Sequence, residues 1–117
     1  MNHVKPLATE ENVWIDEAFR AAIAKPCCKQ DTLNLAVAKR LSVPKNIQVS
    51  LADFRAPFVG LPEGIHAVWL LLEDDPQSVF YDPATKKFGA CWGPEIETGE
   101  YIDLGFRSDD PLEMYIA

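Results

Sequence analysis

Cys91, His66 and Asp103 are the side chains whose types could together support nucleophilic chemistry. A thiol beside an imidazole and a carboxylate on adjacent strands is the arrangement that thiol catalysis needs. The sequence around them contains no G-x-S-x-G elbow, no H-E-x-x-H and no phosphate-binding glycine loop. A histidine at the start of an apolar strand is more often a hydrogen-bonded boundary residue. We therefore expect that the chain is not an enzyme.

Metal and cofactor chemistry finds little support in the spacing of possible ligands. Cys27 and Cys28 are adjacent, Cys91 is distant from both, and no C-x2-C or H-x3-H spacing occurs. The acidic runs 73–75 and 109–110 lack the alternating ligand positions and the central glycine of a calcium loop. We expect no metal and no cofactor, and we interpret the three cysteines as small, semi-buried side chains.

The apolar segments are short, which bears on where the protein works. The first seven residues contain no apolar signal-peptide core, and we expect residues 1–7 to be a flexible N-terminus. The longest strongly apolar run, 65–72, is far below the length of about 20 residues that crosses a bilayer. These features predict a cytoplasmic protein that makes no contact with membranes.

Acidic side chains are unevenly distributed along this chain of 117 residues with net charge −7. Residues 1–60 hold 8 basic and 6 acidic side chains, whereas residues 61–117 hold 3 basic and 12 acidic ones. So acidic a chain is poorly suited to nucleic acid, and we expect a basic protein partner instead. A tyrosine beside an acid on a solvated sheet face is typical of an interface. The predicted partner-binding residues are Glu73, Asp74, Asp75, Tyr81, Glu95, Glu97, Tyr101 and Asp103.

The elements that position these residues follow from the apolar spacing. Spacings of three and four predict helices over residues 9–25 and 31–41, and prolines follow both. Residues 65–72 are apolar at nearly every position and predict a central strand covered on both faces. Mostly alternating patterns predict further extended segments at 47–52, 54–58, 79–82, 87–92 and 100–106. We expect one α+β domain over residues 1–117, with two N-terminal helices packed on an antiparallel β-meander of about four to five strands.

Two functional classes fit these expectations. In size, charge and architecture the chain is similar to bacterial immunity proteins, which are small, acidic, cytoplasmic proteins that mask the basic active sites of toxins. This resemblance implies an inhibitor, although no sequence motif carries it. The alternative is a small-molecule-binding protein with an apolar, aromatic-lined pocket between helices and sheet, where His66 or Arg55 would be the polar contact. A bare apolar face on the sheet would also favour a homodimer.

Overall fold

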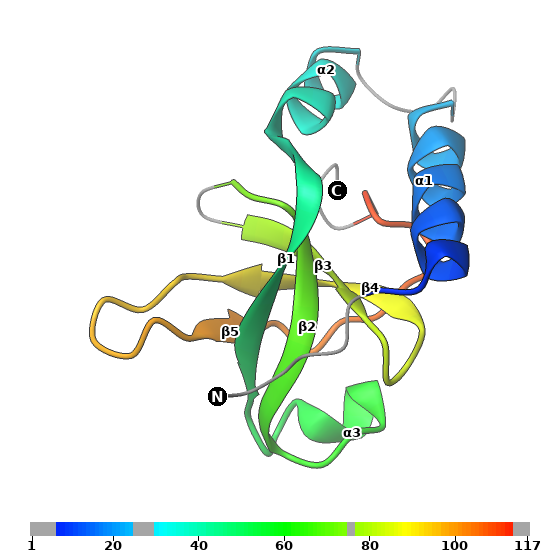
Figure 1. The fold of residues 1–117 in the computed structure, drawn as a ribbon. Coiled ribbons are helices and arrows are strands. Elements are labelled where there is room, and N and C mark those ends of the chain that lie inside the picture. The colour runs from blue at the N-terminus through cyan, green and yellow to red at the C-terminus, as the bar shows by residue number, and fades with distance from the viewer. Residues whose placement is uncertain (1–6, 25–29, 75–76, 114–117) are drawn as a thin grey trace.

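The computed structural model describes residues 7–24, 30–74 and 77–113, and it combines helices with a five-stranded sheet (Figure 1). The α+β class is therefore confirmed. None of the helices in these ranges is long and apolar enough to cross a bilayer. The elements are α1 (Thr9–Ile23), α2 (Gln30–Lys39), β1 (Arg40–Leu51), α3 (Ala56–Val59), β2 (Gly64–Leu72), β3 (Gln77–Asp82), β4 (Lys87–Trp92) and β5 (Tyr101–Asp103).

The sheet is a closed barrel in the order β1-β2-β3-β4-β5, and the prediction of an open meander is wrong. Consecutive strands pair antiparallel, as in a meander, but β5 returns to pair with β1 in parallel. In that closing pair Val49 lies opposite Tyr101 and Ser50 opposite Ile102. Closure leaves every strand with a neighbour on both sides and gives the sheet an enclosed inner face.

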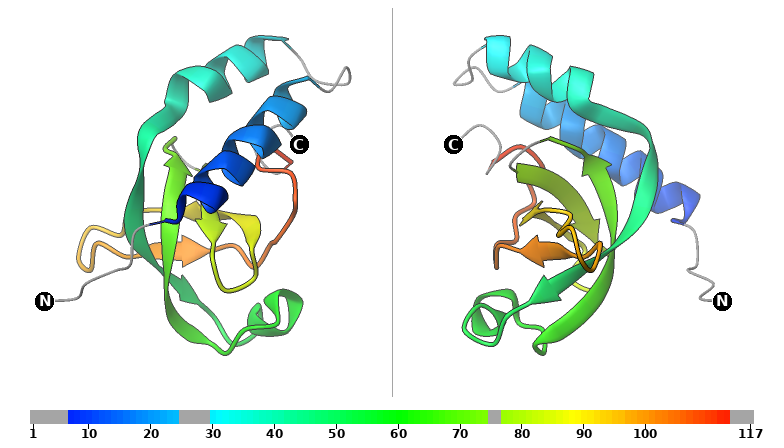
Figure 2. Two further views of the ribbon diagram at one scale, coloured as in Figure 1. Left: turned by 45° about the vertical axis from the view of Figure 1, so that its right-hand side comes forward. Right: turned by 90° about the vertical axis from the view of Figure 1, so that its left-hand side faces the viewer.

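The barrel has two hydrophobic cores because both faces of its central strands are covered. The inner core fills the barrel with side chains of one parity, such as Val68 and Phe80. The outer core lies between α1 and the outer face of β3 and β4, where Phe19 of α1 packs with Tyr81 and Phe88. Figure 2 shows α1 crossing the outside of the barrel, and α2 above it. Neighbouring residues of β3 are thus buried on opposite faces.

The start of α1 and the turn between β3 and β4 lie where the sequence predicts them, whereas α3 does not match the prediction. Helix α1 begins at Thr9 as expected, although the N-cap is Ala8. The turn 83–86 joins β3 to β4, with Asp82 paired to Lys87. The extended segment expected at 54–58 is wrong, because α3 forms there with a proline in its first turn. Proline is tolerated at that position since its missing N–H would have no helical partner anyway.

Candidate functional site

The loop between β4 and β5, residues 93–100, projects from one end of the barrel (Figure 1). Its backbone is held by internal hydrogen bonds. Glu95 N donates to the carbonyl of Glu100 and Gly99 N donates to the carbonyl of Glu95, each at 2.9 Å. Glu100 N also donates to Thr98 Oγ1 at 3.2 Å. The loop therefore presents Ile96, which is fully exposed, on a backbone with defined hydrogen bonds.

Glu73 and Asp74, which directly follow β2, lie at the same end of the barrel as this loop. Leu72 at the end of β2 pairs with Val79 near the start of β3, and Gln77 at that start pairs with Trp92, after which the 93–100 loop begins. Burial, and then the charge of Glu73, raises the pKa of the Tyr101 hydroxyl. The carboxylate of Glu73 is thus close enough to act on the first residue of β5.

Asp74 is more constrained than its neighbour Glu73. Its backbone N–H donates a hydrogen bond to Ser78 Oγ at 3.1 Å. One of its carboxylate oxygens lies 3.8 Å from Lys39 Nζ. Trp92 is 48% exposed at the base of the 93–100 loop. We call this surface the acidic loop end and define it as Glu73, Asp74, Trp92, Glu95, Ile96, Glu97 and Glu100.

Three of the predicted partner-binding residues lie inside the protein rather than on this surface. Tyr101 and Asp103 belong to the inner face of β5, and Asp103 has no exposed area. Tyr81 is buried under α1, and its hydroxyl donates to Glu11 Oε2 at 3.0 Å. The expectation that Tyr101 and Asp103 share a solvated face is therefore wrong, because barrel closure buries that face. Asp75 lies outside the described residues.

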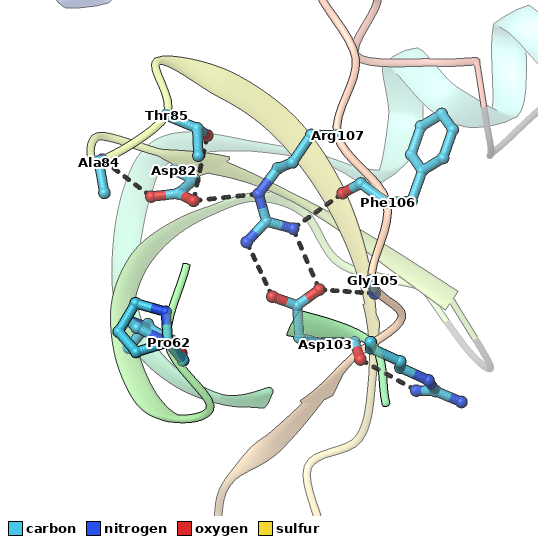
Figure 3. Close-up of polar contacts among 10 residues, drawn as sticks. Pro62, Asp82, Ala84, Thr85, Asp103, Gly105, Phe106 and Arg107 are labelled. Carbon is cyan, nitrogen blue, oxygen red and sulfur yellow. Dashed lines mark hydrogen bonds and ion pairs between the residues drawn. The ribbon is translucent and has the colours of Figure 1, made fainter. Parts of the chain in front are cut away.

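Asp103 instead belongs to a buried ion-pair network around Arg107 (Figure 3). Arg107 Nη2 and Nη1 donate to the two carboxylate oxygens of Asp103 at 2.8 Å and 3.1 Å, and Arg107 Nε donates to Asp82 Oδ2 at 3.0 Å. The guanidinium also lies 4.8 Å from the ring centroid of Phe80. The side chains of all three charged residues are almost inaccessible to water. This fork-like geometry is the strong form of the arginine–carboxylate pair.

The two carboxylates of the network also hold turns of the backbone. Asp82 Oδ1 accepts from Ala84 N at 2.9 Å, and Asp103 Oδ1 accepts from Gly105 N at 2.9 Å. Because Asp82 ends β3 whereas Gln77 begins it, the network lies at the opposite end of the barrel from the acidic loop end. Its contacts are those of a structural element that closes this end.

Electrostatics within the network favour the charged form of Arg107. Burial alone would lower the pKa of the guanidinium, but hydrogen bonds and charge attraction from Asp103, followed by Asp82, raise the net value. An ionised arginine between two carboxylates satisfies the strong requirement that buried charges be paired. All buried side-chain nitrogens and oxygens of the described residues have a hydrogen-bond partner.

The candidate catalytic residues are not assembled. Cys91 lies opposite Asp103 on the neighbouring strand, as a thiol site requires, but His66 is on β2, which is separated from β4 by β3. His66 Nε2 lies 2.7 Å from the carbonyl oxygen of Pro62. Cys27 and Cys28 lie outside the described residues, within which no group of three or more possible metal ligands comes together.

The environment of Cys91 opposes formation of a thiolate. Burial, and then the charge of Asp103, raises the pKa of the thiol to about 12, although Arg107 acts in the other direction. Because the thiolate is the nucleophile, a thiol with such a pKa is unreactive at neutral pH. Cys91 therefore behaves as a small apolar residue of the inner core.

We expect native Cys91 to resist alkylation by iodoacetamide at pH 8, in a C27S/C28S background that leaves it as the one remaining thiol. Labelling should be at least about 100-fold slower than for the same protein in urea, because it requires opening of the barrel. Intact-mass spectrometry over time measures the rate. Labelling at the rate of the unfolded chain would show that the thiol is accessible and the inner core is open.

A cavity of about 650 Å³ lies between α1 and the turn that joins β3 to β4. Trp14 and Tyr81 line it, whereas the polar contacts expected for an aromatic pocket, His66 and Arg55, do not. This cavity therefore differs in place and in polar lining from the pocket expected between the two helices and the sheet.

Sequence reasoning missed the residues that matter most at both ends of the barrel. The sequence does not reveal that Ile96 is exposed, because an isoleucine in a polar loop can be exposed or buried. Arg107 does carry a signal, since it is the last basic residue of the chain and follows a long acidic stretch. Comparison of the chain with protein-family models, with curated proteins and with solved structures finds no match.

Proposed function

We propose that this protein is a small protein-interaction module, an inhibitor or immunity-type protein, that uses the acidic loop end to mask a basic partner. The observation that carries the proposal is the fully exposed Ile96 between Glu95 and Glu97, on a loop whose backbone is hydrogen-bonded internally. An apolar side chain held in water is costly in the free protein and becomes favourable when a partner covers it.

The composition of the acidic loop end resembles the anatomy of an interface. Ile96 and Trp92 are its exposed apolar residues, and tryptophan is enriched among residues that dominate binding energy. Glu95 and Glu97 flank Ile96 in the sequence, and their carboxylates, together with that of Glu100, would attract a basic partner before contact. A loop that is ordered before binding loses little conformational entropy when the complex forms.

The carboxylates and the apolar side chain of Ile96 are expected to affect different rate constants of binding. The carboxylates should act mainly on the association rate and give it a strong dependence on salt, because attraction at long range is screened. Ile96 should act mainly on the dissociation rate, since apolar contacts form only in the complex. Two sets of substitutions can therefore separate the two effects.

The experiment begins with capture of partners from a lysate of the source organism on immobilised protein, followed by purification of the captured protein. We expect a basic protein whose affinity falls at least about 10-fold between about 50 mM and about 500 mM salt. Ile96→Ser should speed dissociation at least about 10-fold, and the double variant E95Q/E97Q should slow association several-fold. Biolayer interferometry with the purified pair measures both rates.

Matched controls lie elsewhere on the surface. Val37→Ser removes an exposed apolar side chain from α2, and the double variant E17Q/D53N removes two exposed carboxylates. Neither control should change the rates. An affinity that is independent of salt, or a complex indifferent to Ile96→Ser, would contradict the proposal.

A further inference from the structure

The cavity between α1 and the β3–β4 turn is separate from the acidic loop end. It lies at the end of β3 marked by Pro83 and Lys86, whereas the loop end lies where β3 begins. Its volume of about 650 Å³ falls within the usual range for small-molecule sites, about 300–1,000 Å³. Its lining contains two aromatic rings and two carboxylates, together with one lysine.

Trp14 provides an open aromatic surface in this cavity. One face of its indole ring stacks on Phe88, with centroids 5.1 Å apart and planes only 3° from parallel, and Tyr81 meets it edge-on at 5.7 Å. The residue is nevertheless 37% exposed. Because Phe88 covers one face, the exposed area is available to a flat or aliphatic group, and an indole face also attracts cations.

Glu11 provides a carboxylate whose position is fixed. Its Oε2 accepts the hydrogen bond from the Tyr81 hydroxyl at 3.0 Å, and its Oε1 accepts from the backbone N–H of Ala8 at 3.4 Å. Burial, and then the hydrogen bond and charge of Glu11, raises the pKa of Tyr81 to about 12, so the tyrosine remains a donor at neutral pH. Each carboxylate oxygen retains a lone pair that can accept another hydrogen bond.

The charges around the cavity differ in how firmly they are placed. Glu11 is half-buried and hydrogen-bonded, and Glu10 adds a second carboxylate beside it. Lys86, on the turn, is exposed to solvent, so water screens its charge more strongly. The fixed charge of the site is therefore negative.

We propose that this cavity binds a small organic cation, namely a protonated amine carried by an aromatic or aliphatic body. The ammonium group donates hydrogen bonds to Glu11, and the apolar body lies on the exposed part of the Trp14 indole ring. A charge-assisted hydrogen bond combined with contact to an indole ring distinguishes such a ligand from a neutral or anionic molecule of the same shape.

The test compares probes of one shape and different charge: phenethylamine, 2-phenylethanol and 3-phenylpropionate. Titrations followed by ¹H–¹⁵N NMR should move the indole N–H signal of Trp14 while those of Trp69 and Trp92 stay in place. We expect phenethylamine to bind at least about 10-fold more tightly than 3-phenylpropionate, the difference that one charge-assisted contact gives. Equal affinity for all three probes, or no saturable shift of the Trp14 signal, would overturn the proposal.

Variants assign the cation preference to Glu11. E11Q keeps an acceptor for the Tyr81 hydroxyl and should weaken phenethylamine binding about 10-fold, whereas the control E17Q, on the same helix but outside the cavity, should have no effect. K86M should strengthen amine binding about 2-fold by removing a like charge. Unchanged affinity in E11Q, or weaker amine binding in K86M, would contradict the assignment.

A lysine side chain of another protein would offer the same ammonium chemistry. Nα-acetyl-lysine amide presents that group without an aromatic body, and we expect it to bind at least about 5-fold more weakly than phenethylamine because it makes less contact with Trp14. Tighter binding of the lysine probe would assign the cavity to a peptide segment and overturn the small-molecule assignment.

Discussion

Replacement of Arg107 by methionine is expected to lower the free energy of unfolding by about 3–5 kcal/mol, the usual cost of removing one partner from a buried ion pair. Methionine retains much of the apolar length of the side chain but none of its charge. Asp82 and Asp103, both buried, would then face each other without a cation. Urea denaturation followed by far-UV circular dichroism measures the loss.

Two further variants separate this effect from a general loss of packing. Arg40→Met removes an arginine that also pairs with a carboxylate, Asp16, and also lies over an aromatic ring, Phe19, but its side chain is 31% exposed. We expect that control to cost about 1 kcal/mol or less. The triple variant R107M/D82N/D103N should be more stable than R107M alone, because it removes the stranded charges. A triple variant less stable than R107M would show that charge pairing is not the source of the loss.

Gly89→Ala is expected to destabilise the protein by about 3 kcal/mol, toward the upper end of the range for overpacking a well-filled interior. A Cβ at this position would lie 2.5 Å from Cζ of Phe80, 2.8 Å from Nη1 of Arg107 and 2.9 Å from the carbonyl oxygen of Phe106. The backbone oxygen cannot swing away, and the guanidinium is held by its carboxylates. The added methyl group must therefore displace part of the barrel. Thermal and urea denaturation report the cost.

The matched control is Gly60→Ala, at the C-cap of α3. Gly60 has a left-handed backbone with φ of 80°, and a Cβ there would have no neighbour within 4 Å. That substitution should cost only the conformational strain of about 1–2 kcal/mol. If Gly89→Ala were no more destabilising than Gly60→Ala, the close packing of β4 against Phe80 and Arg107 would be refuted.

Elements with a local cause could be predicted from the sequence. The apolar side chains Ile15, Phe19 and Ala22 recur at helical spacing, and they are the buried face of α1. Asp82 and Pro83 predict the turn that follows β3, and the structure places it at residues 83–86. In both cases the residues that carry the signal are neighbours along the chain, so no knowledge of distant contacts is needed.

Barrel closure has no such local signal. The alternation around Tyr101 and Asp103 predicts a strand with one solvated face, and a strand of an open meander would have this pattern. The parallel pairing of β5 with β1 makes that face an interior, and the acid is accommodated there only because Arg107 arrives four residues later. Whether a carboxylate such as that of Asp103 is buried depends on these long-range contacts and not on the net charge of its half of the chain.

The candidate surface was predicted in part. The acidic residues Glu73, Glu95 and Glu97 are exposed, as expected for turn residues in an acidic half of the chain. Their apolar companion Ile96 could not be recognised, because isoleucine in a loop is equally compatible with an anchor to the core. Its exposure follows from the internal hydrogen bonds of residues 93–100, which direct the loop away from the barrel.

The parallel pairing of Val49 with Tyr101 has a consequence for the order of events during synthesis of the chain. While β5 is still inside the ribosome, the nascent sheet can pair β1 through β4 but retains two open edges. Those edges are surfaces on which another strand can add. The exposed interval ends only when residues up to Arg107 have emerged and its side chain can neutralise Asp82 and Asp103. The two edges therefore stay open to strand addition until β5 has paired with β1, and aggregation through them is favoured during that interval.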